Sequence, residues 1–246
     1  MCITRKFEPI SCFEWEGSKP ASLYIVDLKT EKMQELSIPC LFTFHHVNAY
    51  DEGPDTIIMD VSSYPSPSLL YHLQLEILRD PMKRNSGSPH ATLKRLRINL
   101  SNGTVDELPL DLNLASPSLS SFLDMPVINE QFRSKFYCYV YGLVPKSDNL
   151  TLSDHLVVKK DLCGQGKLDR SWKIAGHSPS EPWFVPSPHG MAEDDGLLMV
   201  PVLDFRRAVT YLAVLDAMTM TLVNQADMPT YIPLSLHGRY FELDEL

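Results

Sequence analysis

Proline restricts the fold of this chain more than any other residue, because it interrupts the sequence at short intervals. The 246 residues contain 19 prolines, and few of the gaps between them would hold a long helix. The apolar runs in these gaps are short and rich in β-branched or aromatic residues, which is typical of strands bounded by turns. The clearest runs cover residues 23–28, 56–61, 136–144, 197–203 and 209–215. The sequence therefore predicts an all-β protein.

One segment, residues 67–80, departs from this pattern and predicts a helix. Ser66-Pro67 is a typical helix start, and the apolar residues that follow recur at helical spacing. These residues are Leu69, Leu70, Leu73, Ile77 and Leu78. We therefore expect one helical insertion, from Ser68 to Asp80, in an otherwise β-rich chain.

Internal repeats indicate how the strands are arranged. Residues 23–30 (LYIVDLKT) and 212–219 (LAVLDAMT) share an apolar strand, an Asp, two further residues and a Thr. Two hairpins are expected between them, turning at Asn102-Gly103 and near residues 164–166. Acidic turns that end in glycine, at 50–53 and 193–196, precede apolar runs. The pattern favours a partial β-propeller of about four blades, forming one domain portion over residues 1–246, and a β-sandwich is the alternative.

Charge and composition exclude several classes of protein. The chain carries 22 Lys+Arg against 31 Asp+Glu, a formal net charge of −9, which argues against a nucleic-acid partner. No apolar stretch approaches the roughly 18 residues of a transmembrane helix, and the N-terminus lacks the apolar run of a signal peptide. The five cysteines form no CxxC pair, so we expect free thiols in a reducing compartment, with Cys40 and Cys138 as ordinary core residues. These observations predict a cytoplasmic protein.

Histidine is the residue type most able to carry chemistry here, but no local motif organises it. The eight histidines show no HExxH spacing, and GxSxG, Walker and GxGxxG motifs are absent. A site must therefore be assembled from distant segments. His45 and His237 occupy matching positions after the two repeats, and only one of the neighbours His45 and His46 can face such a site from a strand. The alternative is that each is a core histidine hydrogen-bonded to the backbone.

Four motifs, in order, resemble those of the carotenoid cleavage oxygenases. They are FTFHHVNAYDEG (42–53), SEPWFVPSP (180–188), EDDGLLMVPVLD (193–204) and IPLSLHGRYF (232–241). The resemblance runs from about residue 20 to residue 241 and covers what looks like the C-terminal half of the family's chain. That family includes carotene dioxygenases, plant and bacterial enzymes that cleave double bonds, and the retinoid isomerohydrolase of the visual cycle.

The resemblance implies a seven-bladed propeller that holds Fe(II) on its axis through four histidines and activates O₂ to cleave a C=C bond of a carotenoid or apocarotenoid. By motif position, His45 and His237 match the third and fourth iron ligands. Glu181 matches a carboxylate that hydrogen-bonds a ligand histidine. Asp124 stands where the family usually has Glu, so its side chain reaches about one methylene less. His46 matches no ligand and is expected to point away from the axis.

The first two iron histidines belong to the part of the family that this sequence does not match. We therefore expect a portion of a non-haem iron dioxygenase that is inactive alone, with a polyene substrate, O₂ and a peripheral membrane contact for substrate uptake as partners. The rival interpretation is a non-catalytic binding or interaction module. A shared metal site requires the ring nitrogens of His45 and His237 to lie within roughly 3–5 Å of each other. Glu181 should then hydrogen-bond one of the two rings.

Overall fold

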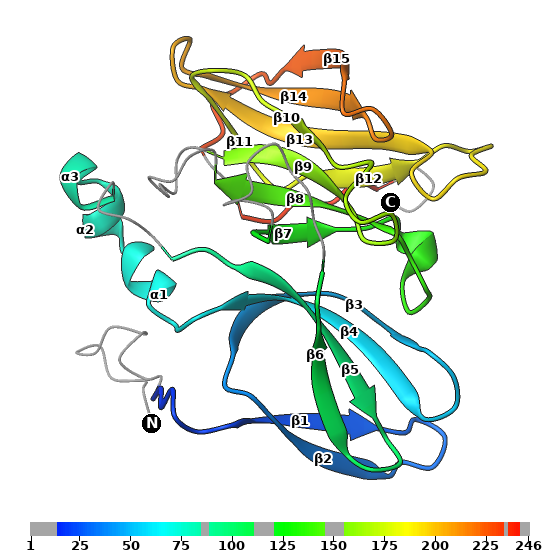
Figure 1. Ribbon diagram of the computed structural model, residues 1–246. Coiled ribbons are helices and arrows are strands. Elements are labelled where there is room, and N and C mark those ends of the chain that lie inside the picture. The colour runs from blue at the N-terminus through cyan, green and yellow to red at the C-terminus, as the bar shows by residue number, and fades with distance from the viewer. Residues whose placement is uncertain (1–13, 85–88, 111–120, 146–154, 234–235, 242–246) are drawn as a thin grey trace.

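The computed structural model describes residues 14–84, 89–110, 121–145, 155–233 and 236–241. These residues form antiparallel sheets that follow one another along the chain (Figure 1). The first sheet pairs β1 (Ala21–Val26) with β2 (Met33–Ile38). The second contains, in order, β3 (Phe42–Asp51), β4 (Thr56–Tyr64), β5 (Thr92–Asn99) and β6 (Thr104–Leu108).

The last two sheets are built in the same way from the C-terminal part of the chain. The third sheet contains β7 (Asp124–Val127), β8 (Tyr139–Pro145), β9 (His155–Asp161) and β10 (Arg170–Trp172), with a 3-10 turn, η3 (Glu130–Phe132), between β7 and β8. The fourth contains β11 (His177–Pro179), β12 (Trp183–Pro186), β13 (Gly196–Asp204), β14 (Val209–Asp216) and β15 (Leu222–Asp227). The short β11 and β12 both pair with β13, so together they form one interrupted edge strand.

The apolar clusters show that the sheets pack as successive blades. One cluster joins β2 to the β3–β6 sheet, a second joins that sheet to β7–β9, and a third joins β7–β9 to the last sheet. The middle sheets are therefore buried on both faces: on β8, Val140 faces the second cluster and Tyr141 the third. A β-sandwich would share one core between two sheets. The predicted all-β, propeller-type arrangement is confirmed.

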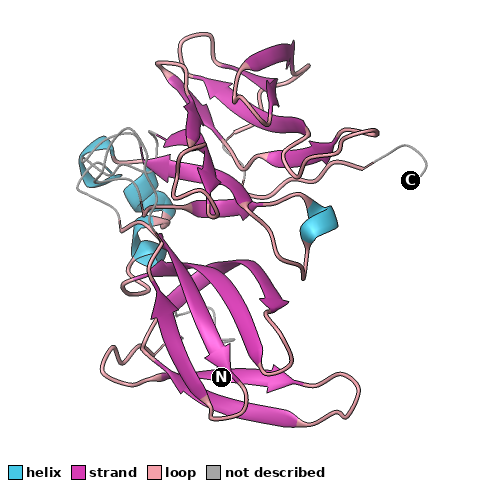
Figure 2. Ribbon diagram, turned by 45° about the vertical axis from the view of Figure 1, so that its right-hand side comes forward, coloured by secondary structure: helices cyan, strands magenta, loops and turns pink. Residues whose placement is uncertain are grey.

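The helical insertion is present, but the prediction of one helix from Ser68 to Asp80 is wrong. Three single turns take its place, α1 (Leu69–His72), α2 (Leu75–Leu78) and α3 (Pro81–Arg84). Gln74 has extended backbone angles, and Pro81 starts the third turn after Asp80. Both views place these turns beside the junction of the β3–β6 and β7–β10 sheets (Figures 1 and 2). No helix in the described ranges is long and apolar enough to cross a membrane.

The expectation of free thiols is wrong for two cysteines. Cys138 and Cys163 form a disulfide, with Cα atoms 5.1 Å apart. They flank the β8–β9 hairpin, in which Tyr139 lies opposite Asp161, so the strand register brings them together. Cys40 is a free thiol as expected, while Cys2 and Cys12 lie outside the described residues. The cytoplasmic location, which was inferred in part from free thiols, stays a prediction.

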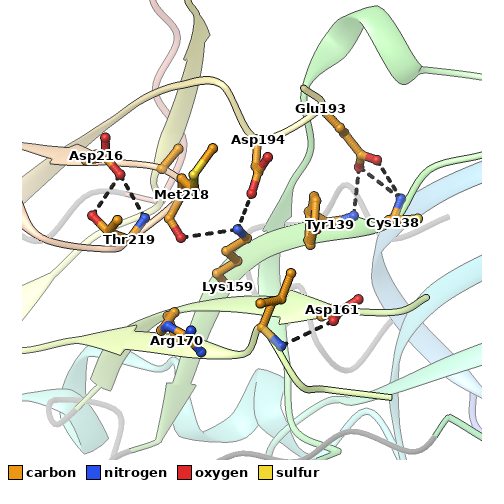
Figure 3. A network of polar contacts seen from close by, with 12 residues as sticks. Cys138, Tyr139, Lys159, Asp161, Arg170, Glu193, Asp194, Asp216, Met218 and Thr219 are labelled. Carbon is orange, nitrogen blue, oxygen red and sulfur yellow. Dashed lines mark hydrogen bonds and ion pairs between the residues drawn. The ribbon is translucent and has the colours of Figure 1, made fainter. Parts of the chain in front are cut away.

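The acidic turn before β13, which contains Glu193 and Asp194, links the last sheet to the third through polar contacts (Figure 3). The Glu193 carboxylate accepts hydrogen bonds from the backbone N–H groups of Cys138 and Tyr139, at 2.7–2.9 Å. The next residue, Asp194, forms an ion pair with the buried Lys159 of β9 at 2.5 Å. Burial raises the pKa of Glu193 above its ordinary value, although the two N–H groups favour the charged form. The turn is therefore a junction between two blades.

Candidate functional site

The first strand of each of the three large sheets is irregular where it carries a predicted site residue. In β3, the register with β4 shifts between Thr43 and His45, so Phe44 is an extra residue on that strand. Neighbouring side chains of a regular strand point to opposite faces, whereas a bulge can turn both to one side. As a result, Phe44 and His45 both line one cavity. His46 is exposed and does not line it, as expected.

Asp124 occupies a comparable irregularity at the start of β7. It lies opposite Leu143 of β8, and the register then shifts before Val127. Met125 has a φ of 47°, an uncommon conformation for a residue with a side chain, and Pro126 follows it. Asp124 and Leu143, which lie directly opposite each other, both line the same cavity.

Glu181 lies in the interruption between β11 and β12. Pro179 and Pro182 flank it, and a proline has no N–H to donate to a strand ladder. The Ser180 N–H still donates to the Pro201 carbonyl at 2.8 Å, which keeps the chain beside β13. The interruption leaves the Glu181 carboxylate available for contacts outside the sheet.

The two histidines each use Nδ1 to hydrogen-bond a carboxylate. His45 Nδ1 lies 2.7 Å from Asp124 Oδ1. His237 Nδ1 lies 3.1 and 3.2 Å from the two Glu181 oxygens. The predicted hydrogen bond from Glu181 is therefore confirmed, and the shorter Asp124 does reach a histidine. Because an ionised carboxylate only accepts, both Nδ1 atoms carry a proton, and in the neutral form of each ring the lone pair is on Nε2.

Tyr64 completes the first pair and was missed in the sequence. Its hydroxyl donates to Asp124 Oδ2, while its ring is buried against Phe42 and Phe44. Burial opposes ionisation of Asp124, but the hydrogen bonds from His45 and Tyr64 outweigh it, so the pKa of Asp124 lies below its ordinary value. Burial and the Asp124 charge together raise the pKa of Tyr64. At neutral pH, Tyr64 is therefore a donor and Asp124 a charged acceptor. A tyrosine at the end of a strand gives no sequence signal for this role.

The two histidine rings lie against each other although they are far apart in the sequence. Their centroids are 5.3 Å apart, with an interplanar angle of 80°. The predicted approach of His45 and His237 is confirmed, and the separation of their ring nitrogens stays a prediction. Within the described ranges, no group of three or more His, Cys, Asp or Glu residues is arranged to hold a metal ion. The donor set of two neutral imidazoles, each with its second nitrogen bound to a carboxylate, fits a pair of ligands for a divalent transition metal.

Both histidines line a cavity of about 470 Å³. Its wall is mostly apolar and includes Phe44, Leu69, Leu73, Leu78, Leu123 and Leu143. The break at Gln74 shifts the helical spacing by one residue, so that Leu78 follows Leu69 and Leu73 on this wall. A second pair of histidines, His90 and His155, also lines the cavity and was assigned no role from the sequence. The space is suited to an apolar ligand with few polar groups.

Comparisons with known proteins agree with this arrangement. The family model described as "Retinal pigment epithelial membrane protein" matches residues 2–242. A carotenoid dioxygenase of Neurospora crassa is 27% identical over 92% of this chain and 40% of its own length. The human beta,beta-carotene 15,15'-dioxygenase is 25% identical over 96% of this chain and 46% of its own length. This chain thus spans less than half the length of these relatives.

The fold is similar to that of a solved relative. The crystal structure of cobalt-substituted ACO from Synechocystis superposes with a TM-score of 0.77 and 24% identity, over 93% of this chain and 45% of that one. The Synechocystis apocarotenoid-15,15'-oxygenase is 26% identical in sequence over 93% of this chain. Because the family model covers nearly the whole sequence, this chain belongs to the retinal pigment epithelial membrane protein family, which confirms the resemblance to carotenoid cleavage oxygenases.

Proposed function

We propose that this chain is part of an Fe(II)-dependent oxygenase that uses O₂ to cleave a C=C bond of a carotenoid or apocarotenoid. The observation that carries the proposal is the contact between His45 and His237, each with Nδ1 bound to a carboxylate, on the wall of an apolar cavity. The names of the relatives, among them a carotenoid dioxygenase and an apocarotenoid oxygenase, support the reaction class. The cobalt-substituted structure supports a metal ion in this fold.

In this proposal, the two carboxylates fix the tautomer of the two imidazoles. Asp124 and Glu181 each hold a proton on Nδ1, so the Nε2 lone pair is the one available to a metal. Tyr64 donates to the remaining oxygen of Asp124 and so fixes the plane of that carboxylate. Fe(II), when bound, would supply the activation of O₂.

The cavity wall would select and desolvate the substrate. A polyene has a long apolar body, and its transfer from water to an apolar wall is favourable in proportion to the area buried. The leucines of α1 and α2 and the aromatic ring of Phe44 provide such a wall next to the histidine pair. The same wall keeps bulk water away from the reacting double bond.

We expect the 246-residue chain alone to bind iron substoichiometrically and to show no cleavage. The described residues offer two imidazoles at one point, and two such ligands compete poorly with water for Fe(II). A cleavage assay on β-carotene and an apocarotenal, together with iron analysis of the purified chain, tests this expectation. One iron per chain with O₂-dependent cleavage would contradict it.

The test of the site itself is a Co(II) titration of the full chain, followed by the visible absorption of the bound ion. We expect His45→Ala and His237→Ala each to lower the affinity about tenfold or more, because each removes one of two imidazole ligands. His46→Ala is the matched control: it removes the neighbouring, exposed histidine and should leave the titration unchanged. Equal effects of all three substitutions would contradict the site. A chain that binds polyenes but no metal would favour the non-catalytic binding module.

A further inference from the structure

The second histidine pair of the cavity has no role in the metal site. His90 lies just before β5 and His155 is the first residue of β9, and their ring centroids are 6.0 Å apart at an interplanar angle of 66°. Both rings line the same cavity as His45 and His237. We propose that the His90–His155 pair hydrogen-bonds the oxygen-bearing end of a polyene, so that the cavity takes an apocarotenoid rather than a hydrocarbon carotene. This inference rests on the proposed function and names its substrate class.

The pair is held in place by the junction of two sheets. The Leu123 N–H donates to the Ala91 carbonyl at 3.1 Å, and the Leu93 N–H donates to the Ser121 carbonyl at 2.7 Å. This bridge joins the start of β5 to the segment before β7 and sets His90 against the ring of Phe122, at 6.1 Å. Backbone hydrogen bonds of Ala91 and Leu93, the residues that follow His90, therefore hold this segment in place.

The strand register sets the distance from this pair to the metal-site carboxylate. Asp124 lies opposite Leu143, and His155 lies opposite Pro145, two residues further along β8. Two strand spacings across the sheet and two residues along it separate the Cα atoms of Asp124 and His155 by about 12 Å. Leu143 and Pro145 both line the cavity between them. The two histidine pairs thus line one cavity at two separate places.

This distribution of polar groups matches a ligand that is polar at one end. The polar lining residues fall into two groups, one around His45 and His237 and the other at His90 and His155. An imidazole can donate to an aldehyde, hydroxyl or carboxylate oxygen, whether it is neutral or protonated. A hydrocarbon end group has no oxygen to accept such a hydrogen bond, so it lacks this contribution to the binding free energy.

The test compares the binding of β-carotene and an apocarotenal to the full chain by quenching of the fluorescence of its three tryptophans. A chelator in the buffer removes any metal, so that the metal site cannot contribute. We expect His90→Phe and His155→Leu each to weaken the apocarotenal about tenfold while β-carotene binding is unchanged, as the loss of one hydrogen bond predicts. His155→Gln retains a side-chain donor and should recover part of the loss.

Unchanged β-carotene binding also shows that each variant is folded. His189→Leu, which replaces an exposed histidine, is the control and should alter neither affinity. Equal weakening of both ligands, or no change in either, would overturn the inference while the metal titration leaves the proposed function standing. If the unaltered chain bound neither polyene, both the inference and the proposed function would fail.

Discussion

The two histidine–carboxylate pairs of the site are alike in chemistry and differ in how they are supported. His45 and Asp124 are 19% and 25% exposed, and both belong to strands of multi-stranded sheets. His237 is 61% exposed and belongs to residues 236–241, which contain no strand, while Glu181 is 12% exposed in the break between β11 and β12. The first pair joins two sheets, and the second joins a terminal segment to a sheet.

This difference indicates which of the two hydrogen bonds results from the packing of the sheets and which one helps to position its partner. The positions of His45 and Asp124 are set by strand ladders and by the apolar cluster between their sheets, so their hydrogen bond follows from the packing. Glu181 instead accepts from both His237 Nδ1 and the Gly238 N–H, at 3.1 Å each, and so helps to place the segment. The Arg239 guanidinium adds a contact 5.7 Å from the Trp183 ring. We therefore expect the two pairs to respond differently to substitution.

The largest expected effect is a loss of stability, caused by a substitution in the buried polar cluster that joins the two sheets of the first pair. Asp60 of β4 is fully buried and accepts from Arg95 at 2.8 Å, through both oxygens, and from the Tyr137 hydroxyl at 2.5 Å. Tyr137 precedes β8, so this cluster joins the two sheets that carry His45 and Asp124. Asp60→Ala leaves a largely buried guanidinium without its partner and should cost about 3–5 kcal/mol of unfolding free energy in urea denaturation.

Glu52→Gln is the matched control for that experiment. Glu52 forms an ion pair with Arg97 on the same sheet, but both side chains are nearly half exposed. Exposed pairs contribute less than about 1 kcal/mol, so the midpoint of unfolding should change little. A comparable loss in both variants would show that the Asp60 cluster does not carry the junction between the sheets.

The second expected effect concerns the terminal segment. Glu181→Ala removes the acceptor for His237 and for the Gly238 N–H, two hydrogen bonds of about 1 kcal/mol each, so the exchange rate of the Gly238 amide should rise roughly 30-fold. Hydrogen exchange resolved by NMR measures this rate. Glu181→Gln keeps one acceptor oxygen and should give an intermediate value.

Asp124→Ala provides the comparison for the first pair. It removes the partner of His45 in the same way, yet the β3 amides are held by the ladder with β4 and should exchange as before. Faster exchange of the β3 amides in Asp124→Ala, together with no change at Gly238 in Glu181→Ala, would contradict this comparison. It would mean that the first hydrogen bond positions its strand and that the second does not position the terminal segment.

The sequence predicted those parts of the molecule that depend on local pattern or on a complete motif. Short apolar runs between prolines gave the strands, and the FHH and SEP motifs led to His45 and Glu181. What it missed depends on register. The partner of Cys138 is set by the pairing of Tyr139 with Asp161, and the break at Gln74 is a tertiary effect that overrides helical periodicity.

The irregularities in β3 and at the start of β7 were also not predicted from the sequence. A regular β3 would send Phe44 and His45 to opposite faces, and nothing in the sequence marks Phe44 as the extra residue of a bulge. Likewise, nothing in the sequence marks the positive φ at Met125, the neighbour of Asp124, whose short side chain does reach His45. That His45 and His237 lie together could be predicted, whereas the backbone irregularities beside His45 and Asp124 could not.

A third, smaller effect tests whether the space around residue 124 fits an aspartate better than a glutamate. Asp124→Glu restores the residue usual in the family, but Asp124 already contacts both His45 and Tyr64, so an added methylene overfills the space. We expect a loss of about 1–2 kcal/mol in unfolding free energy. Tyr64→Phe removes the hydroxyl and makes room, so the double variant should lose less than the sum of the single variants in a double-mutant cycle. Additive losses would show that Tyr64 does not limit the length of the side chain at position 124.

The smallest expected effect is the pH dependence of the first pair. Because hydrogen bonds from His45 and Tyr64 hold the pKa of Asp124 below its ordinary value of 3.8, the ionised form stabilises the folded chain. That contribution is fully present above pH 3.8 and is lost as the pH falls through the lower pKa of the folded state. Glu193, whose pKa is raised by burial, contributes with the opposite sign, so the unaltered chain alone does not isolate Asp124.

The quantity to measure is therefore the difference in unfolding free energy between the unaltered chain and Asp124→Asn at a series of pH values. This difference should be constant from neutral pH to about pH 5 and should shrink in the acid range, where Asp124 is protonated in the unfolded chain. In a Tyr64→Phe background, one of the hydrogen bonds that lower the pKa of Asp124 in the folded chain is gone, so the shrinkage should begin in the same pH range but be smaller and end at a higher pH. A difference that grows as the pH falls would mean that the pKa of Asp124 is raised, and that burial, rather than His45 and Tyr64, decides the charge on the first pair.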